Sequence, residues 1–125
     1  MKKIFSTKDA PQAIGPYSQA VLQNNTLYIS GQIAINPENG ILKTDNITEE
    51  TKQVMKNISE ILKSENMSLS NVVKCSIFMK DMNQYNEIND VYSSYFTEKF
   101  PAREAVQVSK LPKDVNVEIS VIAMK

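Results

Sequence analysis

Apolar residues follow two different spacings along this chain, and the order of the two patterns leaves few possible architectures. From Ile47 to Leu62 they recur every three or four residues, with Glu, Lys and Gln between them. This spacing predicts an amphipathic helix capped by Asn46 or Thr48. A second helical stripe comes later in the chain, at Tyr85, Ile88, Tyr92, Tyr95 and Phe96.

The other apolar segments alternate with polar residues, as half-buried strands do. Strands are predicted at residues 2–6 and in YSQAVLQ, TLYISGQIAI, VVKCSIFMK, REAVQV and VNVEISVIAM. Asn24 and Asn25 are expected to join the second and third strands as a hairpin, and LPKD is expected to make antiparallel neighbours of the last two. Six strands and two helices predict one α+β domain over residues 1–125, with a single mixed sheet and both helices packed on one face.

Such a sheet leaves its second face without a cover. On the covered face we expect Val73, Cys75, Ile77 and Met79 from the fourth strand, and Val115, Val117, Ile119, Val121 and Ala123 from the last. The opposite face of the last strand carries Ile122 and Met124 beside polar residues, and Tyr28, Ala34 and Phe78 fall at similar alternate positions. An uncovered face with this many large apolar side chains is expected to be an oligomer contact.

Composition removes several classes of function. Lys plus Arg and Asp plus Glu both number 14, so neither a nucleic acid nor an anionic membrane is an expected partner. The chain has no histidine and one cysteine, which excludes Ser-His-Asp and Cys-His nucleophile systems and argues against a thiolate or imidazole metal site. A carboxylate-only magnesium site stays open, although no tight acidic cluster suggests one. The lone Cys75, with no signal-peptide or membrane-span pattern, predicts a cytoplasmic protein.

Two charged residues stand where apolar strands are predicted. Arg103 lies at the start of the strand in FPAREAVQV, and Glu118 lies mid-strand between Val117 and Ile119. A solvated glutamate or an Arg103–Glu118 salt bridge between adjacent strands is the plain interpretation. If the open face is an interface, Glu118 needs a partner or a function, because burying an unpaired charge is costly.

Weaker signals come from polar or small residues in apolar surroundings. Asn89 lies on the apolar stripe of the second predicted helix, so its amide must find partners, of which a structural hydrogen bond is the plainest. Tyr17 follows the stiff Gly15-Pro16 turn. Ser30-Gly31 interrupts an apolar strand, which indicates either a bulge or close approach of a ligand. Cys75 is most simply a core residue.

Together these segments resemble a known family. IGPYSQAV, LYISGQI, the N-x-x-Y spacing of Asn89 and Tyr92, FPAR and LPKDVNVEI follow one another as in the reactive-intermediate deaminases, often called RidA or YjgF-type proteins. The resemblance covers residues 3–123. It implies a chorismate-mutase-like α+β fold, a homotrimer with sheets around a central barrel, and three clefts between subunits.

The resemblance also implies an activity. It is the hydrolytic deamination, without a cofactor or a metal, of 2-imino acids such as 2-iminobutanoate and 2-iminopropanoate, and of the enamines that tautomerise to them, to 2-keto acids and ammonia. Arg103 corresponds to the arginine that grips the substrate carboxylate, and Glu118 to the glutamate that places the attacking water. The cleft is expected to be lined by Tyr17, the backbone of Ser30 and Gly31, Asn89 and the backbone of Ala105.

Residue 105 departs from the commonest pattern, because many members carry cysteine where this chain has alanine. A mechanism that needs a thiol there is excluded, whereas a backbone role is not. Glu104 adds a carboxylate beside Arg103 in the sequence. Two other functions stay open: a non-enzymatic carboxylate-binding or regulatory protein using the same cleft, and RNA cleavage, against which the zero net charge and missing histidine weigh.

Overall fold

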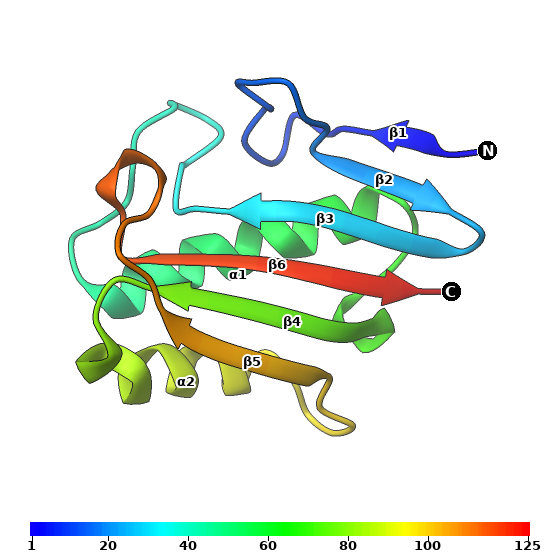
Figure 1. The fold of residues 1–125 in the computed structure, drawn as a ribbon. Helices are drawn as coiled ribbons and strands as arrows, with labels where there is room; N and C mark the ends of the chain where they lie inside the picture. Colours follow the sequence, from blue (N-terminus) through cyan, green and yellow to red (C-terminus); the bar gives the residue numbers. More distant parts are fainter.

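The computed structural model describes residues 1–125 and contains one six-stranded sheet and two α-helices (Figure 1). The order of strands and helices is the predicted one. The elements in chain order are β1 (Lys3–Phe5), β2 (Ala20–Gln23), β3 (Thr26–Gln32), α1 (Ile47–Ser64), β4 (Val72–Met79), α2 (Tyr85–Ser94), β5 (Ala102–Gln107) and β6 (Val117–Met124). Both helices lie behind the same face of the sheet, as expected (Figure 1). Neither is long and apolar enough to cross a membrane.

The sheet is mixed, with the strand order β1-β2-β3-β6-β4-β5. Only β4 and β5 run parallel, because α2 carries the chain back between them, and the other neighbouring pairs are antiparallel. The prediction that the last two strands are neighbours is therefore wrong. After LPKD, β6 passes the end of β4 and pairs with β3 and β4 (Figure 1). In this position both edges of β6 are paired with another strand. Beside β5, at the edge of the sheet, β6 would have a partner on one edge only.

Alternation along β6 is confirmed, because its odd-numbered residues are buried beneath the helices and its even-numbered ones are not. Two other positions differ from expectation. Val73 is 44% exposed, because a register shift between Val72 and Lys74 gives the inward position to Val72. Ala34 is fully buried, because it follows β3 rather than continuing its alternation.

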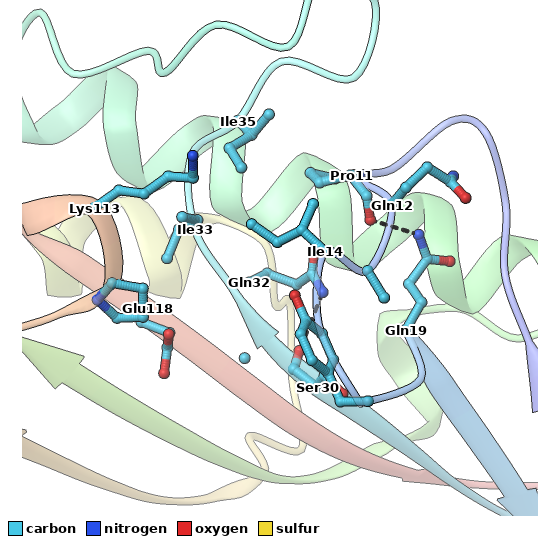
Figure 2. Close-up of a pocket in the computed structure, with 14 residues that line it drawn as sticks. Pro11, Gln12, Ile14, Gln19, Ser30, Gln32, Ile33, Ile35, Lys113 and Glu118 are labelled. Atoms are coloured by element: carbon cyan, nitrogen blue, oxygen red, sulfur yellow. Dashed lines mark hydrogen bonds between the residues drawn. The ribbon is translucent and has the colours of Figure 1, made fainter.

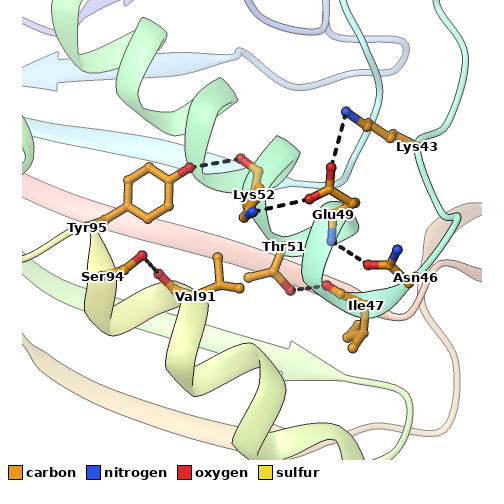
Figure 3. A network of polar contacts seen from close by, with 9 residues as sticks. All are labelled: Lys43, Asn46, Ile47, Glu49, Thr51, Lys52, Val91, Ser94 and Tyr95. Atoms are coloured by element: carbon orange, nitrogen blue, oxygen red, sulfur yellow. Dashed lines mark hydrogen bonds and ion pairs between the residues drawn. The ribbon is translucent and has the colours of Figure 1, made fainter.

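Local sequence explains two of the connections. Asn24 and Asn25 both have positive φ, 49° and 69°, which is the backbone of a tight hairpin turn between β2 and β3. The α1 cap is Asn46, whose Oδ1 accepts a hydrogen bond from the Glu49 backbone N–H at 2.8 Å (Figure 3). The helices also contact each other, and the Tyr95 hydroxyl of the segment after α2 donates to the Lys52 carbonyl at 3.5 Å (Figure 3).

The face of the sheet away from the helices exposes large apolar side chains. Tyr28, Val106 and Met124 are 49%, 40% and 46% exposed, and Phe78 and Ile122 are half-buried between them. Monomeric proteins seldom expose a contiguous apolar patch of this kind. This is the surface on which the sequence predicts a contact between copies of the chain.

Candidate functional site

The residues singled out in the sequence fall into two groups on opposite faces of the sheet. Arg103 and Asn89 meet between β5 and α2, together with Tyr85 and Tyr92, and we call these four residues the arginine cluster. Glu118 lies on the face away from the helices, beside a cavity that Tyr17, Ser30 and Gly31 also line.

The arginine cluster holds a cation in a fixed orientation. Arg103 Nη1 donates to Asn89 Oδ1 at 2.7 Å, and Nη2 donates to the Tyr85 hydroxyl at 2.6 Å. The guanidinium carbon lies 4.9 Å from the centre of the Tyr92 ring and 5.6 Å from that of Tyr85. A guanidinium has five N–H donors, so three are left for another acceptor. The cluster therefore presents an oriented fork with the geometry that a carboxylate matches.

No carboxylate of the chain neutralises this cation. The ion pairs of the structure do not include Arg103, and the salt bridge with Glu118 considered from the sequence does not form. Glu104 points to the opposite face of the sheet, where it pairs with Lys74 at 3.4 Å. The partner of the Asn89 side-chain oxygen is Arg103.

Cys75 lies in the core beside Tyr92 of the arginine cluster. Cys75 is fully buried, and burial raises the pKa of its thiol. Burial likewise raises the pKa of the Tyr92 hydroxyl. Both groups therefore keep their protons at neutral pH, and Cys75 is a core residue, as the sequence indicated.

The second group of residues surrounds a cavity of about 460 Å³, the Glu118 pocket (Figure 2). Its lining comprises Pro11, Gln12, Ala13, Ile14, Tyr17, Gln19, Ser30, Gly31, Gln32, Ile33, Ile35, Pro112, Lys113 and Glu118. Glu118 is its only carboxyl group, and burial raises the pKa of that group above the ordinary glutamate value. A carboxylate with a raised pKa accepts protons more readily than a surface glutamate does, which suits proton transfer.

Ser30 and Gly31 form the bulge that was one of the two interpretations of this interruption. The β3–β6 register shifts between Ile29 and Gln32, and the Ser30 hydroxyl donates to the Ser18 carbonyl at 2.6 Å. A Cβ on Gly31 would lie only 2.7 Å from the Glu118 carboxyl group. The lack of a side chain at Gly31 therefore makes room for the Glu118 carboxyl group, and the φ of Gly31 is not positive.

Gly31→Ala is expected to lower turnover by displacing Glu118. The added methyl group meets the end of a flexible side chain, so Glu118 rotates away and the backbone keeps its path. A shift of about 1 Å in a reacting group costs up to about 100-fold in rate. Steady-state kinetics and thermal unfolding measure the two effects; an alanine variant as active as wild type would show that the Glu118 conformation is not required.

Sequence reasoning missed several residues of the pocket, chiefly the apolar wall of Ile14, Ile33 and Ile35 and the cation of Lys113. Lys113 and Asp114 both adopt positive φ, 55° and 56°, which folds LPKD back over the cavity. That conformation carries no signal in the residue types. Gln19, which was also missed, is 2% exposed and donates to the Pro11 carbonyl at 2.8 Å, holding the N-terminal loop across the pocket (Figure 2).

Arg103 and Glu118 do not belong to one site within a single chain. Arg103 pairs with Cys75 of β4, whose β6 partner is the inward-facing Val121, whereas Glu118 pairs with Phe78 and faces outward. Strands are about 4.8 Å apart, so with β4 between them β5 and β6 are separated by about 10 Å. Ala105, two residues along β5 from Arg103, is half-buried on the inward face. The fold therefore places Arg103, whose guanidinium is oriented to bind a carboxylate, on one face of the sheet. It places Glu118, whose pKa is raised, on the other face.

These features define a class: a small α+β protein with a preorganised arginine on one face of its sheet and a pocketed glutamate on the other. A sequence model described as Endoribonuclease L-PSP matches residues 7–125. A bovine (Bos taurus) 2-iminobutanoate/2-iminopropanoate deaminase is 50% identical over all of this chain and 91% of its own length. The chain belongs to this family, and the resemblance to RidA and YjgF-type proteins is confirmed.

Solved structures agree with that assignment. A protein of the conserved Rid family, YyfA from Yersinia pestis, is 47% identical and superposes with a TM-score of 0.97, covering both chains completely. Escherichia coli TdcF, solved with bound serine, is 35% identical with a TM-score of 0.94 over 98% of each chain. The predicted α+β fold is therefore confirmed by the strands and helices of the chain and by these structures.

Proposed function

We propose that this protein hydrolyses small 2-imino acids, such as 2-iminobutanoate and 2-iminopropanoate, to 2-keto acids and ammonia. The observation that carries the proposal is the pair of complementary half-sites, a free guanidinium fork and a pocketed glutamate with a raised pKa. The deaminase name of relatives that share about half of their sequence with the chain supports the same reaction. The family description as an endoribonuclease has less support, because the chain lacks histidine and carries no net positive charge.

The half-sites divide the reaction between them. The unused N–H groups of Arg103 hold the substrate carboxylate and fix the C2 carbon in front of Glu118. Glu118 accepts a proton from water as its oxygen adds to C2, and that proton passes to the imine nitrogen. The carbon–nitrogen bond then breaks as the C2 carbonyl forms, so both protons of the water leave on ammonia. A carboxylate, a guanidinium and water are sufficient for this sequence.

The two half-sites must come from neighbouring copies of the chain, since one chain holds them on opposite faces. We propose a homotrimer in which the exposed face of Tyr28, Val106 and Met124 is covered and each cleft combines Arg103 of one subunit with Glu118 of another. Tyr17, Ser30, Gly31, Asn89 and the backbone of Ala105 line the clefts in this arrangement.

Sedimentation equilibrium at micromolar concentration is expected to give about three times the chain mass of 14.1 kDa, following the symmetric assembly proposed here.

Mixing two inactive variants tests whether neighbouring subunits share each cleft. Arg103→Ala and Glu118→Gln, each inactive alone, are expected to regain about a quarter of wild-type activity after mixed refolding in equal amounts, because one cleft in four then has both groups. A monomer, or mixtures without recovery, would remove the inter-subunit site.

The activity itself is tested by generating 2-iminobutanoate in situ and following its disappearance with and without the protein. Accelerated loss that needs Arg103 is the expected result. Binding of 2-oxobutanoate without acceleration would instead support the carboxylate-binding or regulatory alternative. Cleavage of RNA by the same preparation, abolished with Glu118→Gln, would favour the nuclease.

A further inference from the structure

A glutamate far from the open face of the sheet is connected to Glu118 through the backbone. Glu50, in the first turn of α1, is fully buried. Its Oε2 accepts hydrogen bonds from the backbone N–H groups of Asn116 at 2.8 Å and Val117 at 3.2 Å, and its Oε1 accepts from Asn116 Nδ2 at 2.7 Å. All three donors lie at the start of β6, directly before Glu118.

The burial of Glu50 is compensated by hydrogen bonds and not by a cation. A buried carboxyl group is unfavourable unless hydrogen bonds replace the water it has lost. Glu50 has no lysine or arginine partner, so its compensation comes entirely from the two residues that lead into β6. An apolar side chain at this position would fill the space without bonding to the backbone, whereas Glu50 accepts from the two backbone N–H groups at the start of β6.

We propose that Glu50 is a positioning residue that sets the place of Glu118 in its pocket. Two contacts set the position of Glu118: its carboxyl group packs against Gly31 of β3, where a Cβ would lie 2.7 Å away, and Glu50 holds the backbone N–H of Val117, the residue before it. A backbone shift at Val117 therefore moves the Glu118 carboxyl group relative to the substrate. This inference rests on the proposed function, since it assigns Glu50 to the deamination through Glu118.

The same helix and strand supply a matched control at their other ends. Glu65, which caps the C-terminal end of α1, is 9% exposed and accepts from Lys125 Nζ, just after β6, at 2.8 Å. Both glutamates thus connect α1 to an end of β6. Only the Glu50 contact lies next to Glu118, so Glu65→Gln is expected to affect stability and leave turnover unchanged.

Asn116→Asp tests the proposal because it sets a second carboxyl group against Glu50 with little change in size. Repulsion is expected to break the contact, lowering kcat by about 10- to 100-fold while KM and the affinity for 2-oxobutanoate stay unchanged, because Arg103 belongs to another half-site. Adding Glu50→Gln is expected to return kcat to within about threefold of wild type, since the introduced amide donates to the introduced carboxylate and its carbonyl accepts from both backbone N–H groups.

Hydrogen exchange of the Val117 amide reports the contact independently of activity. Faster exchange in Asn116→Asp, with exchange and kcat both recovered in the double variant, is the expected result. If the single variant turns over at the wild-type rate, or loses kcat, ligand affinity and stability together, Glu50 is only structural. A wild-type protein that fails to deaminate 2-imino acids overturns the proposed function, and the positioning role with it.

Discussion

Glu118→Gln is expected to lower kcat by about 10²- to 10⁴-fold, the usual effect of removing a positioned general base. The amide keeps the size of the side chain and still orients water, but it cannot take up the proton. Because the Arg103 half-site is unchanged, affinity for 2-oxobutanoate and the oligomeric state are expected to remain as in wild type. Unchanged kinetics in this variant would leave Glu118 as an orienting residue.

The pH dependence of the Tm tests whether Glu118 is buried, independently of the kinetics of the Glu118→Gln variant. Burial raises the pKa of Glu118 in the folded protein, so the folded state binds the proton more tightly than the unfolded state does. Wild type therefore loses stability as pH rises from the ordinary glutamate pKa through the raised one. The glutamine variant does not titrate, so its Tm is expected to match wild type at low pH and exceed it at neutral pH. An equal Tm at both pH values would contradict the burial of a charged Glu118.

Periodicity determines which parts of this fold are predictable from the sequence. The stripe from Ile47 to Leu62 and the alternation of β6 are local patterns repeated often enough to exclude other structures, and both are confirmed. On β4 the inward positions of Cys75, Ile77 and Met79 are confirmed and that of Val73 is wrong, because a register shift at Val73 leaves no mark on residue type. Strand order depends on which edges pair across the whole sheet, and alternation within a strand contains no information on its neighbours.

Single residues of the site could be predicted from the sequence, but their contacts and relative positions could not. Arg103 and Asn89 were each identified as misplaced polar groups, yet their mutual hydrogen bond follows from the parallel pairing of β4 and β5 after α2. Glu50 and Gln19 were missed for the opposite reason: their types are those of surface residues, and only tertiary packing buries them. Family resemblance supplied roles for single positions, whereas the separation of Arg103 from Glu118 needed the strand order.

Arg103→Lys is expected to reduce kcat/KM by at least about tenfold although the positive charge is kept. Lysine is a point charge without the planar fork, so it cannot hold Asn89, Tyr85 and both oxygens of a carboxylate in one orientation. Losing one charge-assisted hydrogen bond is worth roughly 1.5–3 kcal/mol, and 1.4 kcal/mol corresponds to a factor of ten. Lost alignment of C2 with the attacking water lowers kcat further.

Arg103→Ala separates a carboxylate anchor from a structural cation. If Arg103 served only to join β5 to α2, lysine would restore most of the stability that alanine loses, and turnover would follow stability in both variants. If Arg103 binds substrate, alanine is expected to be less active than lysine, and activity to fall much further than Tm in both. The guanidinium forms no ion pair within the chain, so the loss of stability is limited to its contacts with Asn89 and the two tyrosines. Steady-state kinetics paired with thermal unfolding distinguish these cases. Full activity in the lysine variant would exclude the two-pronged contact, and full activity in the alanine variant would exclude Arg103 from the site.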